Sequence, residues 1–267
     1  MRLSVGRVAA LYRYPVKGLS PERRKFLDIL TSGRVAGDRV LAFRFGSTDA
    51  PDDAWTPKAD TLCLMNTPGL ARLAVRFDED HGRMSVVTDG RMLAEEGLDP
   101  AGRQRLAGVL AEFALGLKEN PLAGHPERLP LRLMGDGVTP RYHDSEAGEV
   151  TLHSRESVQA LAESLSHAVD EVRFRSNISV EGMQPWAELA WVGCQVRIGQ
   201  VVFVATRVKG RCLATHANPT TGVRDLPILE TLTEAFAQEK PTFAVSMRPD
   251  GDGGRVSIGD DVEVLDS

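Results

Sequence analysis

The sequence contains little cysteine. Only Cys63, Cys194 and Cys212 occur in 267 residues, far apart and with no Cys-x-x-Cys pair. An odd and sparse set argues against a disulfide framework and favours a reducing compartment. It also excludes a four-cysteine iron–sulfur cluster and a zinc site built only from thiolates.

Long apolar runs and an excess of positive charge are also missing. No stretch of about 18 apolar residues occurs, so we expect no transmembrane helix. Charged residues interrupt residues 1–13 before a signal-type apolar run develops. Lys and Arg number 32 against 37 Asp and Glu, a net charge of −5, which provides no global basic field for nucleic acid. We therefore predict a cytoplasmic protein without a nucleic-acid or membrane partner, in which any anion site is local.

Standard catalytic motifs are absent as well. The sequence has no P-loop, no GxGxxG after a strand, no HExxH and no GxSxG. Its histidines show no metal-ligand spacing, and we interpret each as a surface or internally satisfied residue. His153 and His216 stand apart, because each lies at a predicted strand end near a candidate site segment. The six histidines are His81, His125, His143, His153, His167 and His216.

The composition present is that of a globular protein with a core, at 42% hydrophobic and 26% charged residues. Many short apolar runs alternate with glycine and proline turns, and three or four segments show helical spacing. This pattern predicts an α+β fold with two β-barrel-like mixed domains and a few peripheral helices. Residues 120–130 are rich in turn formers, so the predicted domains are residues 1–119 and 120–267.

Three local predictions concern the second half. Ser154 is expected to cap a helix with an apolar stripe through Val158, Leu161 and Leu165. Alternation over residues 172–180 predicts a strand. Asp225 is expected to cap a helix through about residue 238.

Residues 208–225 carry the strongest chemical signal. Cys212 follows an apolar strand-like run and stands behind two cations, Lys209 and Arg211; a turn-rich loop, residues 218–222, comes after it. A thiol beside fixed positive charge is held partly as thiolate, the form that binds metals and attacks electrophiles. A half-buried, inert cysteine at a strand end is the alternative, and the local motif leaves it open.

Motifs along nearly the whole chain resemble two-part MOSC proteins, in which an N-terminal MOSC β-barrel domain precedes a MOSC domain. The first part is indicated by residues 11–18 (LYRYPVKG), 37–39 and 55–58. The second is indicated by residues 173–178, 191–193, 197–199, 210–215, 218–222 and 258–264. Known groups that the sequence resembles include the mitochondrial amidoxime-reducing component and the bacterial MOSC reductases.

The resemblance implies a molybdenum pyranopterin cofactor (molybdopterin) and reduction of N-hydroxylated or N-oxide compounds. It also carries a family-level association with pyridoxal phosphate binding. Cys212 matches the cysteine that supplies a thiolate to molybdenum, and is thus predicted as metal ligand and catalytic residue, since soft sulfur suits a thiophilic centre. Lys209 and Arg211 would help to keep it deprotonated, although many relatives carry another cysteine in place of Lys209.

The resemblance also assigns residues to the anionic end of the cofactor. Lys17, Arg39 and Arg175 match positions that hold it, and Asn177 matches a neighbouring polar position. Ser154 and Ser157 match polar positions at a helix start, where free N–H groups favour phosphate. The full predicted cofactor-binding set is Lys17, Gly18, Arg39, Ser154, Ser157, Arg175, Asn177, Lys209 and Arg211.

The sequence departs from the amidoxime reductases at several of these places. Gly18 stands where they carry serine, and Ser176 replaces a proline. His216 and Asn218 stand where they have threonine and aspartate. We interpret His216 as a surface turn histidine, with a proton donor near the metal as the alternative.

Electrons must come from outside, because the chain has neither a flavin fingerprint nor cysteines for a cluster. We therefore predict an oxidoreductase that receives electrons from a separate flavin or iron–sulfur reductase and acts on a small molecule. The alternatives are sulfur transfer through a persulfide on Cys212 and a non-catalytic carrier of the cofactor.

Overall fold

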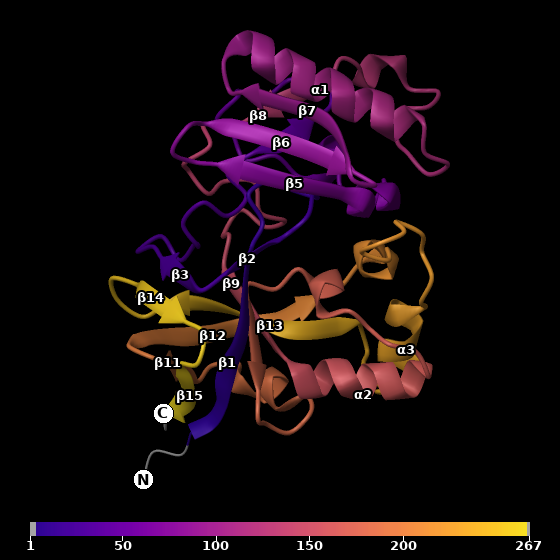
Figure 1. Ribbon diagram of the computed structural model, residues 1–267. Coiled ribbons are helices and arrows are strands. Elements are labelled where there is room, and N and C mark those ends of the chain that lie inside the picture. Colours follow the sequence, from indigo (N-terminus) through magenta and orange to yellow (C-terminus); the bar gives the residue numbers. More distant parts are fainter. Residues whose placement is uncertain (1–3, 266–267) are drawn as a thin grey trace.

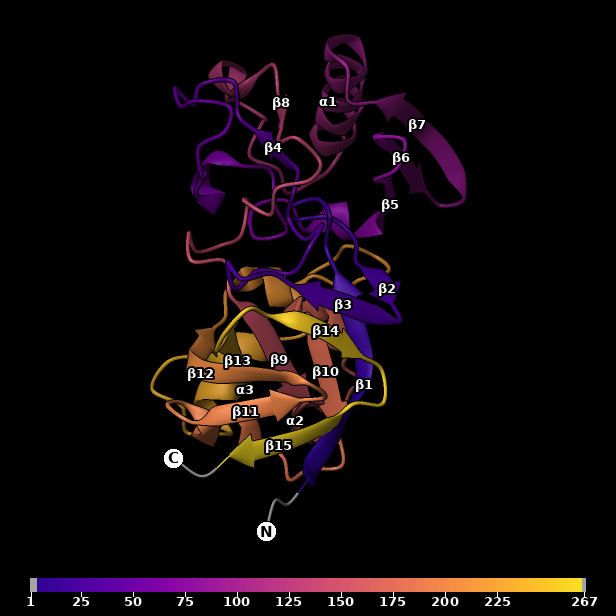
Figure 2. The ribbon, with the colours of Figure 1, turned by 90° about the vertical axis from the view of Figure 1, so that its left-hand side faces the viewer.

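The largest sheet closes on itself. The computed structural model describes residues 4–265 of the chain. Seven strands pair around a ring, all antiparallel except β9 with β10, and β2 (Glu22–Arg24) extends from β1 outside the ring (Figure 2). In ring order they are β10 (Ile178–Glu181), β9 (Val150–Ser154), β13 (Thr242–Pro249), β12 (Val201–Gly210), β11 (Gln195–Ile198), β15 (Asp261–Leu265) and β1 (Ser4–Arg13).

Alternation of apolar side chains explains the interior of the barrel. Successive residues of a strand point to opposite faces, and β12 buries Val201, Phe203 and Ala205 while the residues between them are less buried. These side chains pack with Leu152 and Met247 from neighbouring strands in one core. The barrel is therefore filled by side chains rather than open.

A second core lies in the N-terminal lobe, at the top of Figure 1. Strands β5 (Leu73–Asp78), β6 (Arg83–Thr88) and β7 (Arg91–Gly97) form an antiparallel sheet, and helix α1 (Pro100–Leu115) packs on it. The Asp99 side chain caps α1 by accepting hydrogen bonds from the backbone N–H groups of Ala101 and Gly102. On the apolar face of α1, Leu106 and Leu110 are fully buried.

Shorter elements complete these two bodies. Two strand pairs are β3 (Phe26–Ile29) with β14 (Gly254–Ser257), and β4 (Ala42–Arg44) with β8 (Arg132–Met134). Helices α2 (Arg155–Leu165) and α3 (Ile228–Glu234) lie beside the barrel (Figure 1). The 3₁₀ turns are η1 (Lys58–Asp60), η2 (Pro68–Arg72), η3 (Pro126–Arg128), η4 (Glu171–Phe174), η5 (Ala187–Trp191) and η6 (Leu213–His216). No helix within residues 4–265 is long and apolar enough to span a membrane.

The predicted α+β class with a barrel and peripheral helices is confirmed. A second barrel is not formed within the described residues: the sheet of β5, β6 and β7 has too few strands to close, β4 and β8 form a separate pair, and α1 covers the apolar face of the three-stranded sheet instead. The boundary between residues 119 and 120 stays a prediction. Strand pairing crosses it four times, since β1 pairs with β10 and with β15, β3 with β14, and β4 with β8.

Two local predictions for the second half are wrong. Residues 172–180 do not form one strand, because η4 is followed by Arg175 in the left-handed region (φ 52°) and the strand begins only at Ile178. Asp225 does not cap α3, which begins at Ile228 after Pro227. Its carboxylate instead accepts hydrogen bonds from Arg173.

Candidate functional site

A cationic pocket of about 360 Å³ is lined by residues from both the N-terminal half of the chain and the segments around the barrel. Cations lining it greatly outnumber carboxylates. The cations are Lys17, Arg39, Lys58, Arg173, Arg175, Arg207, Lys209 and Arg211, and the carboxylates are Asp144 and Glu149. Because most of this charge is not neutralised within the pocket, the site favours an anionic ligand.

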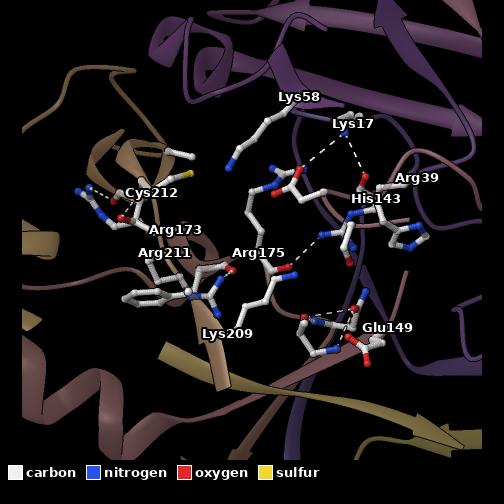
Figure 3. Close-up of a pocket in the computed structure, with 18 of the residues that line it drawn as sticks. Lys17, Arg39, Lys58, His143, Glu149, Arg173, Arg175, Lys209, Arg211 and Cys212 are labelled. Atoms are coloured by element: carbon white, nitrogen blue, oxygen red, sulfur yellow. Dashed lines mark hydrogen bonds and ion pairs between the residues drawn. The ribbon is translucent and has the colours of Figure 1, made fainter. Parts of the chain in front are cut away.

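Cys212 lies at one side of this pocket, opposite Lys17 and Arg39 (Figure 3). Strand β12 ends at Gly210, and Cys212 then begins the 3₁₀ turn η6 in an extended conformation. Its thiol is free and half-buried. Cys63 and Cys194 are also free, but neither lines the pocket. Cys212 is thus the thiol that the fold presents to a ligand there.

Two cations accompany Cys212 from the end of β12. The Arg211 guanidinium donates to the carbonyls of Phe174 (2.8 Å) and Phe243 (2.7 Å), and burial lowers its pKa to about 10. Burial and the charge of Arg211 lower the pKa of Lys209 to about 8. Lys209 has no side-chain hydrogen bond or ion pair to any residue of 4–265. Arg211 is therefore anchored, whereas the Lys209 ammonium is available to a ligand.

Lys17 supplies a buried positive charge on the other side. Pro15 ends β1, and Lys17 follows in the turn, where its side chain is only 3% exposed. The Nζ atom donates to the carbonyls of Thr56 (3.3 Å) and His143 (3.1 Å). Burial lowers the pKa of Lys17. These carbonyls hold the ammonium in place but carry no full negative charge.

Arg39 and Arg175 form a pair between these two sides. Both have left-handed backbones, with φ values of 50° and 52°. Both guanidinium groups lie over the ring of Tyr14, at 4.4 Å and 4.3 Å from its centre. Arg39 also donates to the carbonyl of Arg175 at 3.0 Å. Such backbone strain is maintained only where the surroundings enforce it, and it is common at binding sites.

The buried carboxylate of Asp38 supports this pair from beneath. It forms an ion pair with Arg39, accepts from the Tyr14 N–H (2.7 Å) and the Asn177 amide (3.3 Å), and lies 3.3 Å from the His143 Nε2 atom. Burial opposes its ionisation, but Arg39 and the hydrogen bond from His143 hold the pKa of Asp38 below its ordinary value. Burial lowers the pKa of His143. Asp38 thus orients Arg39 and Asn177.

Ser154 and Ser157 are not part of the pocket. Both are fully buried at the start of α2. The carboxylate of buried Glu188 accepts from the Ser154 N–H (3.2 Å), from Ser154 Oγ (3.3 Å) and from Ser157 Oγ (3.0 Å). An internal anion therefore occupies the helix start at which a phosphate was predicted.

Gly18 has a structural role and does not line the pocket. Its backbone is left-handed (φ 78°), and a Cβ atom there would lie 2.7 Å from the Cα of Cys63. The serine that relatives carry at this position would not fit this geometry without a shift of the chain.

The surface interpretation of His216 is wrong. His216 is 7% exposed, its Nε2 atom accepts from the Leu229 N–H at 3.1 Å, and it does not line the pocket. Burial lowers its pKa. His143 is buried beside Asp38 and does line the pocket. His153 is fully buried and lies outside the pocket.

Seven residues of the predicted cofactor and metal site line the pocket: Lys17, Arg39, Arg175, Asn177, Lys209, Arg211 and Cys212. Sequence reasoning missed Lys58, Asp144 and Glu149. Lys58 belongs to a motif quoted above, residues 55–58, which could have suggested it. Asp144 and Glu149 lie in an irregular segment before β9, where no spacing marks them.

Residues 139–263 match the family model of the MOSC domain. This chain contains a MOSC domain. The family is known as molybdenum-cofactor sulfurase C-terminal-like domains and is associated with binding of the molybdenum cofactor. The MOSC domain supplies Arg175 and Cys212 to the pocket, whereas Lys17, Arg39 and Lys58 come from outside the matched segment.

Solved structures similar to this chain include two bacterial proteins. YiiM from Geobacillus stearothermophilus is 12% identical with a TM-score of 0.33, over 44% of this chain and 54% of that one. The YUAD protein from Bacillus subtilis is 11% identical with a TM-score of 0.40, over 99% of this chain and 97% of that one. The matched part thus spans about half the length of YiiM. No curated protein sequence matches the chain.

Proposed function

We propose that this protein binds a molybdenum pyranopterin cofactor and reduces N-hydroxylated or N-oxide compounds. One observation carries the proposal: the free thiol of Cys212 and the cations Lys17 and Arg39 face one pocket from opposite sides (Figure 3). A separate flavin or iron–sulfur reductase would supply the electrons. The pyridoxal phosphate association stays a family-level prediction.

The residues present fit such a group. A thiophilic metal needs a soft ligand, which Cys212 provides. A phosphate-bearing tail needs several cations with free N–H donors. Lys58 and Lys209 have no anionic partner or side-chain hydrogen bond among the described residues. Arg39 and Arg175 place two positive charges side by side, an arrangement that an anion between or above them would stabilise.

Cys212 would hold the metal, and Arg39, Arg175 and Lys17 would hold the anionic end. When bound, the cofactor would accept an oxygen atom in a two-electron step. The side chains of this protein do not supply that chemistry. Conversion of R–NHOH to R–NH₂ and water consumes two electrons and two protons. The Lys209 ammonium, with a pKa of about 8, holds a proton at neutral pH three residues from Cys212.

Metal analysis after expression in a host that makes the cofactor tests the binding step. We expect stoichiometric molybdenum in the wild type, loss in Cys212→Ser, and retention in the matched control Cys194→Ser, which lies outside the pocket. A chain without molybdenum that carries cyanide-labile sulfur on Cys212 would instead support sulfur transfer.

Viologen-driven reduction of a hydroxylamine or an amidoxime tests the reaction. Molybdenum-loaded protein should oxidise the reduced dye in proportion to the amine formed. Retention of molybdenum without turnover of several N-oxygenated compounds would identify a cofactor carrier and refute the reductase.

A further inference from the structure

Asp144 is a carboxylate placed among the cations of the pocket. It lies in the irregular segment between β8 and β9, and its Oδ1 atom is 3.7 Å from Lys17 Nζ. The surrounding chain removes part of the water near its carboxylate, which opposes ionisation, but the charges of Lys17 and Lys58, with those of Arg39 and Lys209, lower its pKa. Asp144 is therefore ionised at neutral pH and neutralises part of the pocket.

Hydrogen bonds hold the chain just before Asp144, whereas none holds its side chain within residues 4–265. The carbonyl of the preceding residue, His143, accepts from Lys17 Nζ at 3.1 Å and from Trp55 Nε1 at 2.9 Å. The Asp144 side chain is 56% exposed and makes no hydrogen bond within residues 4–265. It can therefore turn outward to water without a change in the backbone.

Glu149, the other carboxylate of the pocket, differs in this respect. Its Oε1 atom accepts from Thr206 Oγ1 at 2.7 Å, its Oε2 atom pairs with Arg207 at 2.5 Å, and its side chain is 12% exposed. Glu149 is held by its partners and its charge is already compensated. Of the two carboxylates, only Asp144 combines a negative charge, a side chain without a hydrogen bond among residues 4–265 and a position beside Lys17.

We propose that Asp144 is an internal counter-ion that a phosphate-bearing ligand must displace. In the empty pocket its carboxylate neutralises Lys17 and the neighbouring cations; on ligand binding it turns away and the phosphate takes its place. This makes the pocket selective, because a dianionic phosphate compensates for the lost ion pair, whereas a monoanion such as acetate or chloride does so only weakly. The inference rests on the proposed function only in that the ligand carries a phosphate.

The strength of the effect follows from the charges involved. Asp144→Asn keeps the shape of the side chain, removes repulsion toward the incoming anion and leaves the cations uncompensated. Because the interaction between charges near a protein surface is weakened by water, we expect a moderate effect, about tenfold tighter phosphate binding. Removing the internal counter-ion should also lower the melting temperature of the ligand-free chain.

Calorimetric titration with inorganic pyrophosphate tests the proposal on the full chain, purified from a host that does not make the cofactor. The matched control is Glu146→Gln, which removes the same charge from the same loop at an exposed position that does not line the pocket. We expect tighter binding in Asp144→Asn only, together with a lower melting temperature that pyrophosphate raises by more than in the wild type. Acetate should bind measurably better to Asp144→Asn than to the wild type.

Three other results would overturn the proposal. Equal gains in Asp144→Asn and Glu146→Gln would show a nonspecific effect of net charge. Weaker binding in Asp144→Asn would show that Asp144 contacts the ligand instead of competing with it. Either result would leave the anion pocket itself intact, whereas a lack of pyrophosphate binding in all three proteins would refute the pocket and both proposals.

Discussion

Asp38 determines whether the cation pair of the pocket keeps its geometry. The side chain is fully buried, and Asp38→Asn would leave the Arg39 guanidinium, itself only 13% exposed, without its counter-charge. Breaking a buried ion pair by removing one partner costs about 3 to 5 kcal/mol. Because the amide keeps part of the hydrogen bonding from Tyr14 and Asn177, we expect about 3 kcal/mol, the lower end of that range. That loss corresponds to a fall in melting temperature of about 6 to 12 °C for a chain of this size.

Urea and thermal unfolding would measure this loss, with Asp28→Asn as the matched control. Asp28 also pairs with an arginine, Arg255, but both side chains are about half exposed. Exposed pairs contribute less than about 1 kcal/mol. A loss in Asp38→Asn as small as that in Asp28→Asn would refute the assignment of Asp38 as the support of Arg39.

The pH dependence provides a second check on Asp38. Its pKa is lowered in the folded state, so its stabilisation is complete above the unfolded pKa of about 4 and is lost as the pH falls below it. The stability difference between wild type and Asp38→Asn should therefore be constant from pH 6 to 8 and narrow toward pH 3. A difference independent of pH over the whole range would contradict the proposed charge interaction.

Three further substitutions separate binding from structure. Lys209 loses its charge as the pH rises through about 8, so pyrophosphate affinity measured by titration should fall between pH 7 and 9 more steeply in the wild type than in Lys209→Arg. Glu188→Ala removes the carboxylate that accepts hydrogen bonds from Ser154 and Ser157 and should lower the free energy of unfolding by about 2 to 3 kcal/mol. The molybdenum content per folded chain should not change. A reduced molybdenum content would show that the start of α2 belongs to the cofactor site. Gly18→Ala should destabilise the chain by more than about 1 kcal/mol in urea unfolding, since the added Cβ atom would lie 2.7 Å from the Cys63 Cα at a positive φ. An unchanged stability would show that this turn can relax.

The sequence alone determined the local chemistry of the site. The apolar alternation of β12 and the cations beside Cys212 are written in consecutive residues, and both keep their predicted place. Pro15 ends β1 and puts Lys17 in a turn by the geometry of its own ring. Such features depend on short-range sterics and periodicity, which a single sequence displays directly.

Only the tertiary structure decided which residues meet. Closure of the barrel brings β1 from the N-terminus beside β15 and β10, which no local pattern predicts. Glu188 reaches Ser154 from 34 positions along the chain and so excludes a phosphate from a helix start that looked suitable. Asp144 enters the pocket only because the loop before β9 is fixed by Lys17 from the other lobe. Burial and charge compensation between distant residues depend on how the whole chain folds. The sequence alone therefore did not show which residues form the site.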